Sequence, residues 1–209
     1  MSNDVAYPVF CTPDPALAVS TARRLVEFGR TEFCKVSVYA ELPSVAAVRR
    51  VAKALPQAWF RGREKPEEFD VARSDARPAL IFGVQGFALP ADSAVYEGRL
   101  PVACELDDLP VGSIEDAFVT LIGPNAGELN WDSLSWPDAP ELDFFGESKH
   151  AEVTLLLNTR TRELDEPVAD HTVLVHVRSI SVDGHQLREP YAHWLAQQVG
   201  LTVTGPGQR

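Results

Sequence analysis

The segment 128–147 combines aromatic and acidic side chains at close spacing, a combination suited to binding a positively charged partner. Indole and phenyl rings can hold a lysine or arginine over the ring face, while carboxylates attract cations and pair with them at the rim of a contact. The alternative is that the rings are core residues of a hairpin and the carboxylates lie on its solvent-exposed face. Both interpretations stay open. The residues are Trp131, Trp136, Phe144 and Phe145 with Glu128, Asp132, Asp138, Glu141, Asp143 and Glu147.

The charge distribution points in the same direction. The 209-residue chain has a formal net charge of −11, and residues 91–170 alone carry 18 acidic and 4 basic side chains. A solvated face that keeps the protein soluble would explain this excess, and so would a docking surface for a basic molecule. We therefore predict a non-enzymatic binding protein that captures a basic protein partner and occludes it, as an antitoxin, an immunity-type inhibitor or an adaptor would. The predicted contact residues are Asp107, Asp108, Glu128, Trp131, Asp132, Trp136, Asp138, Glu141, Asp143 and Phe144, with the two tryptophans as anchors.

An enzyme is the alternative hypothesis, a hydrolase or transferase whose site assembles from distant residues. The charged groups on or beside apolar strands are His176, Arg178, Glu105 and Asp107, and such groups need a structural or catalytic reason. The sequence has no catalytic or metal-binding motif, and its cysteines, Cys11, Cys34 and Cys104, form no C-x-x-C pair. We therefore predict no catalytic residue, no metal and no cofactor.

Nucleic acid and membranes are not expected partners. Anionic phosphates and lipid surfaces repel a chain of this charge unless a basic patch is segregated, and the basic side chains available for one are Arg49, Arg50, Lys53, Arg61, Arg63 and Lys65. The N-terminus resembles no signal peptide, and no run of 18 apolar residues occurs. We expect a cytoplasmic protein.

The first half of the chain predicts alternating strands and helices. Residues 5–12 are expected to form a strand, and Asp14 and Pro15 to open a helix that ends at Gly29. Residues 35–42 alternate as a strand does, and a helix from Ser44 to Leu55 follows. Residues 57–78 show no hydrophobic periodicity and predict a loop. Residues 79–84 and 87–89 after it are expected to be strands.

The second half predicts more strands and a last helix. Residues 118–122 and 128–136 are expected to pair as a hairpin, although Ser113–Asp116 would also cap a helix through Leu121. Residues 152–158 and 172–177 are strong strand candidates, and a helix from Glu189 to Gly200 precedes a last strand at 201–204. The strand–helix–strand order at the C-terminal end favours a parallel crossover.

The fold expected is α+β, or α/β, with helices packed on a mixed β-sheet and β-α-β units at both ends. The composition, 45% apolar and 23% charged, is that of an ordinary globular protein. We predict one domain over 1–209, with a possible division into two lobes near 57–78 and a disordered tail at 205–209.

Overall fold

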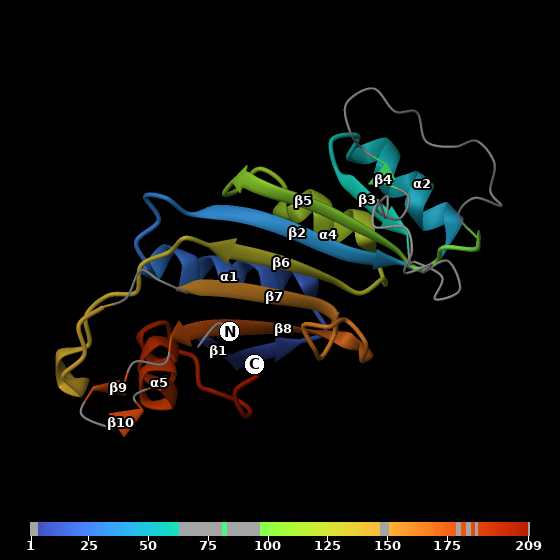
Figure 1. Cartoon of the computed structure of the whole chain (residues 1–209). Helices are drawn as coiled ribbons and strands as arrows, with labels where there is room; N and C mark the ends of the chain where they lie inside the picture. The colour runs from blue at the N-terminus through green and yellow to red at the C-terminus, as the bar shows by residue number, and fades with distance from the viewer. Residues whose placement is uncertain are drawn as a thin grey trace, which may run out of the picture.

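The computed structural model describes residues 4–62, 81–82, 97–146, 151–178, 181–182, 185–186 and 188–208. Eight strands form one sheet in the order β1-β8-β7-β6-β2-β5-β3-β4, and every pairing in it is antiparallel (Figure 1). They are β1 (Asp4–Thr12), β2 (Lys35–Leu42), β3 (Trp59–Gly62), β4 (Ile81–Phe82), β5 (Val102–Pro110), β6 (Gly127–Asp132), β7 (Glu152–Thr159) and β8 (Pro167–Arg178). A separate pair is formed by β9 (Ser181–Val182) and β10 (His185–Gln186).

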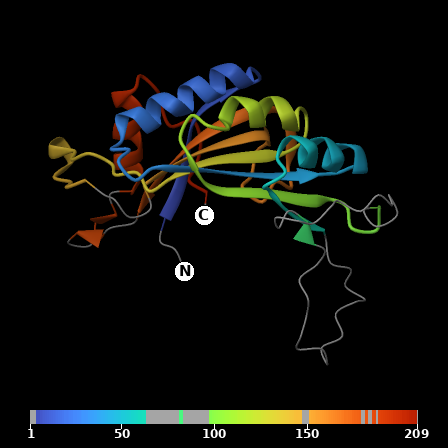
Figure 2. The same ribbon diagram turned by 90° about the horizontal axis from the view of Figure 1, so that it is seen from above.

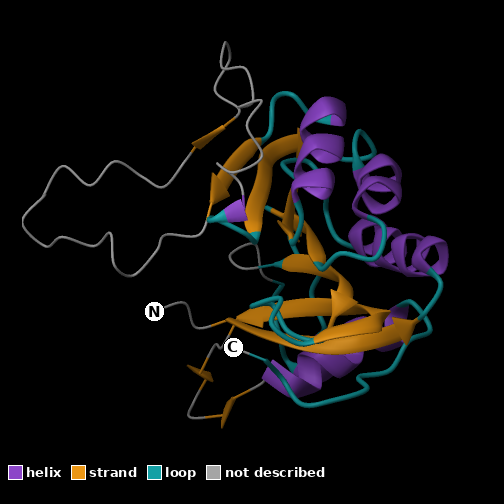
Figure 3. Cartoon of the chain, turned by 90° about the vertical axis from the view of Figure 1, so that its right-hand side faces the viewer, coloured by secondary structure: helices purple, strands orange, loops and turns teal. Residues whose placement is uncertain are grey.

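The helices lie on one face of the sheet, as Figures 2 and 3 show. Their inward side chains join those of the sheet in one main hydrophobic core. We call the opposite sheet face, over which the described residues place no α-helix, the helix-free face. The helices are α1 (Pro15–Phe28), α2 (Val45–Ala54), α4 (Glu115–Ile122) and α5 (Arg188–Gln198), and a short 3-10 helix spans Pro140–Leu142.

The α+β class and the packing of helices on a sheet are confirmed. The side chain of Asp14 caps α1 by accepting hydrogen bonds from the backbone N–H groups of Ala16 and Leu17, as the sequence predicts. The strand predicted at 35–42 is β2, and the helix predicted from Ser44 is α2, which Ser44 caps.

The strand predicted at 118–122 is wrong, because these residues belong to α4. The buried carboxylate of Glu115 accepts hydrogen bonds from the backbone N–H groups of Gly112 and Ile114 and so stabilises the start of the helix. Phe118 and Ile122, four residues apart, then lie buried on one side of it. The helical alternative drawn from residues 113–116 was the correct one.

The parallel crossover and the last strand at 201–204 are also wrong. Gly200, at φ 72°, ends α5, and the chain then runs beside the edge strand β1 without forming a regular strand. The N–H of Thr204 donates to the carbonyl of Pro8, and Ala6 and Gln208 exchange two backbone hydrogen bonds. Residues 205–208, for which a disordered tail was expected, run beside β1 at the edge of the sheet.

The strands predicted between residues 57 and 110 agree only in part with the structure. β5 was not predicted, because its acidic end obscures the alternation of Val102, Cys104 and Leu106. Part of the loop predicted at 57–78 is strand β3, and both β3 and β5 lie in the same sheet. The strand predicted at 79–84 is described only at β4, and residues 63–78 and 87–89 lie outside the described residues. Within the described part of the chain, no helix is long and apolar enough to cross a membrane.

Candidate functional site

Alternation along the strands gives the helix-free face its polar character. On β2 the side chains of Val36, Val38 and Ala40 are buried toward the helices, so Ser37 and Tyr39 face the other way. The same rule places outward-facing residues of β3, β5 and β6 on this face. These residues are Trp59 and Arg61 on β3, Ala103, Glu105 and Asp107 on β5, and Glu128, Asn130 and Asp132 on β6.

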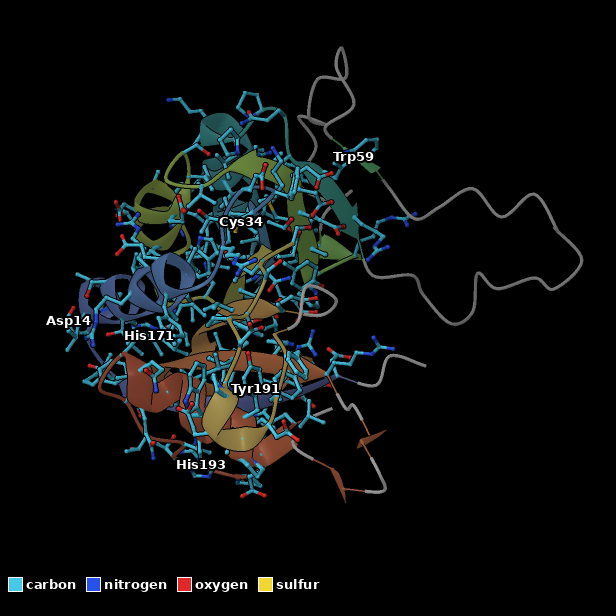
Figure 4. All side chains as sticks on the ribbon, turned by 90° about the vertical axis from the view of Figure 1, so that its left-hand side faces the viewer. Asp14, Cys34, Trp59, His171, Tyr191 and His193 are labelled. Atoms are coloured by element: carbon cyan, nitrogen blue, oxygen red, sulfur yellow. The ribbon has the colours of Figure 1, made fainter. Side chains whose placement is uncertain are left out.

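The strand register arranges four of these side chains in a line. Trp59 pairs with Glu105, Glu105 with Tyr39, and Tyr39 with Glu128. Neighbouring strands lie about 4.8 Å apart, so directly opposed side chains are in contact range. We call Trp59, Glu105, Tyr39 and Glu128 the aromatic–carboxylate row. Trp59 is 47% exposed, and Figure 4 shows it on the opposite side of the molecule from Asp14 and His171.

A β-bulge brings a third carboxylate beside the row. The register between β2 and β5 shifts where Val36 and Val38 pair with Leu109 and Leu106, which places Asp107 and Asp108 in the bulge. Asp108 has φ 58°, and its backbone N–H donates to Ser37 Oγ at 3.4 Å. The result is a groove of ≈ 530 Å³ lined by Ser37, Val38, Tyr39, Glu105, Asp107, Glu128, Asn130, Arg162 and Glu163.

Among the described residues, the carboxylates of this groove have no hydrogen-bond donor, and the nearby cation is Arg162. Within the described residues, the side chains of Glu105, Asp107 and Glu128 make no hydrogen bond and no ion pair. Burial raises the pKa of Glu128, and the charges of Glu152 and Glu163 add to that effect, while Arg162 opposes it. The lining carries four carboxylates, Glu105, Asp107, Glu128 and Glu163, against one cation, Arg162, so negative charge is in excess in the groove.

Tyr39 is held as a neutral phenol between two carboxylates. Burial raises its pKa, and the charges of Glu41, Glu105 and Glu128 act in the same direction, whereas Arg61 lowers it. A neutral aromatic ring flanked by negative charges offers a cation an attractive ring face and two carboxylates to pair with. The groove can therefore receive a lysine or arginine side chain.

The predicted anchors do not belong to this face. Trp131 is 0% and Trp136 2% exposed, and Phe144 is also buried, so the expectation that the tryptophans contact a partner is wrong. Trp131 Nε1 donates to Glu115 Oε1 at 3.1 Å, and Trp136 Nε1 donates to the backbone carbonyl of His176 at 2.8 Å. Each indole has satisfied its polar group within the core, which is the alternative that the sequence left open.

The predicted carboxylates divide between two places. Asp107, Asp108, Glu128 and Asp132 lie on or at the edge of the helix-free face. The others lie in the connection between β6 and β7, where the Gly146 N–H donates to Asp138 Oδ1 at 2.6 Å and Trp194 Nε1 donates to Glu141 Oε1. Asp143 ends the 3-10 helix there with φ 51°. We call this second place, residues 137–146, the acidic connection.

The four candidate residues of the enzyme hypothesis are not brought together. His176 and Arg178 lie on β8, and three strands separate β8 from β5, which carries Glu105 and Asp107. His176 does lie near two other carboxylates, with Nδ1 3.5 Å from Asp4 Oδ2 and 3.8 Å from Glu152 Oε2. Its side chain is 0% exposed, however, so no substrate reaches the ring in this conformation.

The basic side chains considered for nucleic acid do not share a surface. Arg49 and Arg50 are exposed on α2 in the helix layer, whereas Arg61 lies on the helix-free face beside Trp59. Arg50 also donates to the carbonyl of Leu121. Arg63 and Lys65 lie outside the described residues.

Metal and thiol chemistry find no support in the part of the chain that the structure describes. No three of its histidine, cysteine and carboxylate side chains are arranged to hold a metal ion. The cysteines are free, and burial raises the pKa of Cys104 to about 12 and that of Cys34 to about 11. Neither buried thiol is activated as a nucleophile.

Tyr39 and Trp59 are the site residues that sequence reasoning missed. The alternation of β2 places Tyr39 on its polar side, and that pattern was available from the sequence. Trp59 lies within residues 57–78, for which the sequence predicts a loop. The comparisons add no relative: no protein-family model, no curated protein and no solved structure matches this chain.

Proposed function

We propose that this protein binds a basic protein partner through the aromatic–carboxylate row and the groove beside it. A lysine or arginine of the partner lies against Tyr39, pairs with Glu105 and Glu128, and packs its aliphatic stem against Trp59. Asp107 contributes a further negative charge at the rim. The single observation that carries this proposal is the alignment of two aromatic rings and two unpartnered carboxylates across four strands.

Energetic considerations support this assignment. A carboxylate that already accepts a hydrogen bond from the protein gains little binding energy when a cation arrives. The three groove carboxylates without a hydrogen-bond donor gain the full energy of an ion pair with the partner's lysine or arginine. An exposed tryptophan is also a residue type on which binding energy concentrates. The groove thus provides the charge, and Trp59 at the end of the row provides the anchor.

The net charge of the protein supports binding to a basic partner by electrostatic attraction. A chain with a net charge of −11 attracts a basic protein over a distance of about one Debye length, roughly 8 Å at physiological salt. Association is then fast, and the bound protein occludes whatever functional surface of the partner is basic. An inhibitor of the antitoxin or immunity type, or an adaptor, requires no more than this.

The test compares two triple variants that remove the same charge. Glu105→Gln, Asp107→Asn and Glu128→Gln neutralise the groove, while Asp138→Asn, Glu141→Gln and Asp143→Asn neutralise the acidic connection. The partner is recovered from source cells by affinity purification at low salt, identified and purified, and its affinity for each variant is measured by calorimetry at two salt concentrations.

We expect the groove variant to bind at least about tenfold more weakly, with a smaller dependence on salt, and the connection variant to stay within about threefold of the parent. Circular dichroism establishes that both variants are folded. Equal losses in the two variants would mean that only net charge matters, and an unchanged groove variant would refute the proposal.

A further inference from the structure

A second hollow lies on the helix-bearing side of the sheet, far from the aromatic–carboxylate row. It is a groove of ≈ 600 Å³ between the start of α1, the end of α4, the end of β7 and the beginning of β8. We call it the His171 groove. Its lining is mostly apolar and consists of Pro13, Pro15, Val119, Thr120, Ile122, Gly123, Pro124, Leu157, Asn158, Pro167, Val168, Ala169 and His171.

His171 is the polar group built into this groove. Its side chain is only 5% exposed, and the backbone N–H of Asn158 donates to its Nδ1 at 3.3 Å. Because Nδ1 accepts that hydrogen bond, the neutral ring carries its proton on Nε2. Asn158 is itself fixed, since its side-chain amide donates to the carbonyls of Gly123 and Asn125. The ring is therefore held in one orientation.

The Nε2–H of His171 has no acceptor among the described residues. The buried side-chain nitrogens and oxygens without a partner in that part of the chain are Arg162 Nε and His176 Nδ1. Nε2 of His171 is not one of them and has no acceptor in the described part of the chain, so it keeps contact with solvent. Since His171 lines the groove, the groove is where a ligand would reach this donor.

The charges around His171 favour a neutral ligand over an anion or a cation. Burial lowers the pKa of His171, so the ring is neutral at physiological pH, and the nearby charges of Asp170 and Asp14 oppose this effect only in part. Figure 4 shows Asp14 and His171 close together beside α1. These two carboxylates would repel an anion in the groove. A cationic group cannot accept the hydrogen bond that Nε2–H offers.

We infer that the His171 groove is a binding site for a neutral, largely apolar small molecule that carries one hydrogen-bond acceptor, such as a carbonyl oxygen. The apolar body packs against Val119, Ile122 and Leu157, and the acceptor receives the Nε2–H bond of His171. The volume lies within the range of small-molecule sites, which combine an apolar lining with a few fixed polar groups. This inference is independent of the proposed function, because the two sites lie on opposite faces of the sheet.

Acetophenone is a suitable probe, because it is neutral and aromatic and has one carbonyl acceptor. Ethylbenzene is the matched molecule without an acceptor, and benzoate is the matched anion. Each is titrated into the full-length protein while the methyl signals of Val119, Ile122 and Leu157 and the ring signals of His171 are followed by NMR. We expect saturable shifts at these residues with acetophenone, and binding at least about threefold weaker with ethylbenzene and benzoate.

Two variants make the assignment specific. His171→Phe keeps the ring but removes the donor, and it should weaken acetophenone binding about three- to tenfold. Ala169→Trp starts from an exposed lining residue and fills the groove, so it should abolish binding even if His171→Phe fails to fold. Absence of saturable shifts in the parent protein, equal binding of benzoate, or unchanged binding in Ala169→Trp would overturn the inference.

Discussion

Two regions of this protein combine aromatic rings with carboxylates, and they differ in how many of those groups have partners inside the protein. In the acidic connection, Asp138 accepts a backbone N–H and Glu141 accepts the indole N–H of Trp194, while the ring of Phe144 packs 4.1 Å from that of Tyr191. In the aromatic–carboxylate row, the carboxylates of Glu105 and Glu128 have no such partners among the described residues. The first region therefore satisfies Asp138, Glu141 and Phe144 internally while Phe145 stays exposed, whereas the second leaves both carboxylates without a donor.

The difference follows from backbone geometry. An irregular connection leaves N–H groups without strand or helix partners, and nearby side-chain oxygens satisfy them. A strand in the middle of a sheet satisfies its own backbone through its neighbours, so its outward side chains remain available. The same side-chain composition therefore stabilises the fold in one region and can serve binding in the other.

The largest effect expected from this comparison is on stability. Trp131→Ala removes a fully buried indole and the donor to Glu115, and it should lower the free energy of unfolding by about 3–5 kcal/mol. Trp59→Ala, at an exposed position, should lower it by less than about 1 kcal/mol. Urea denaturation of both variants measures these values, and equal losses would contradict the division into a core tryptophan and a surface one.

The next effect concerns binding. Trp59→Ala should weaken affinity for the basic partner about tenfold, because an exposed indole that a partner buries contributes a large share of the binding energy. Phe145→Ala removes an 81% exposed ring from the acidic connection and is the matched control. Its affinity, measured by the same calorimetry, should equal that of the parent. A larger loss with Phe145→Ala would transfer the binding surface to the acidic connection.

A smaller effect distinguishes the carboxylates of the two regions. Asp138→Ala removes the acceptor of the Gly146 N–H and should lower the free energy of unfolding by about 1 kcal/mol. Asp107→Ala removes a carboxylate with no internal partner and should leave stability nearly unchanged while weakening binding. Thermal denaturation and calorimetry of this pair give both values. A clear loss of stability in Asp107→Ala would show that the groove carboxylates support the fold.

The smallest expected effect is the pH dependence of stability that Glu128 causes. Its pKa is raised above the ordinary 4.5 in the folded state, so the folded protein binds more protons than the unfolded chain as the pH rises above that value. Stability is therefore lost as the pH rises through this window, and Glu128→Gln should remove that loss and be slightly more stable at pH 7. Urea denaturation between pH 4 and 8 tests this expectation, which parallel curves for parent and variant would contradict.

The local elements could be predicted because their causes are local. Asp14 and Pro15 define the start of α1, and the alternation of residues 35–42 defines β2, because capping and burial patterns need only a few neighbouring residues. The failure at α4 has a local cause as well. A short apolar run such as residues 118–122 fits a strand or a helix, and the carboxylate of Glu115 in the preceding turn favours the helix.

The sequence by itself determined that helices pack on a sheet, as α+β or α/β, that negative charge concentrates in residues 91–170, and on which face most strand residues lie. Only the tertiary structure decided that Trp59, Glu105, Tyr39 and Glu128, distant in the chain, form one row, and that Trp131 and Trp136 lie in the core. The physical reason is that strand order and register arise from non-local pairing. A local pattern shows on which face a side chain lies, but it does not show which strand becomes its neighbour.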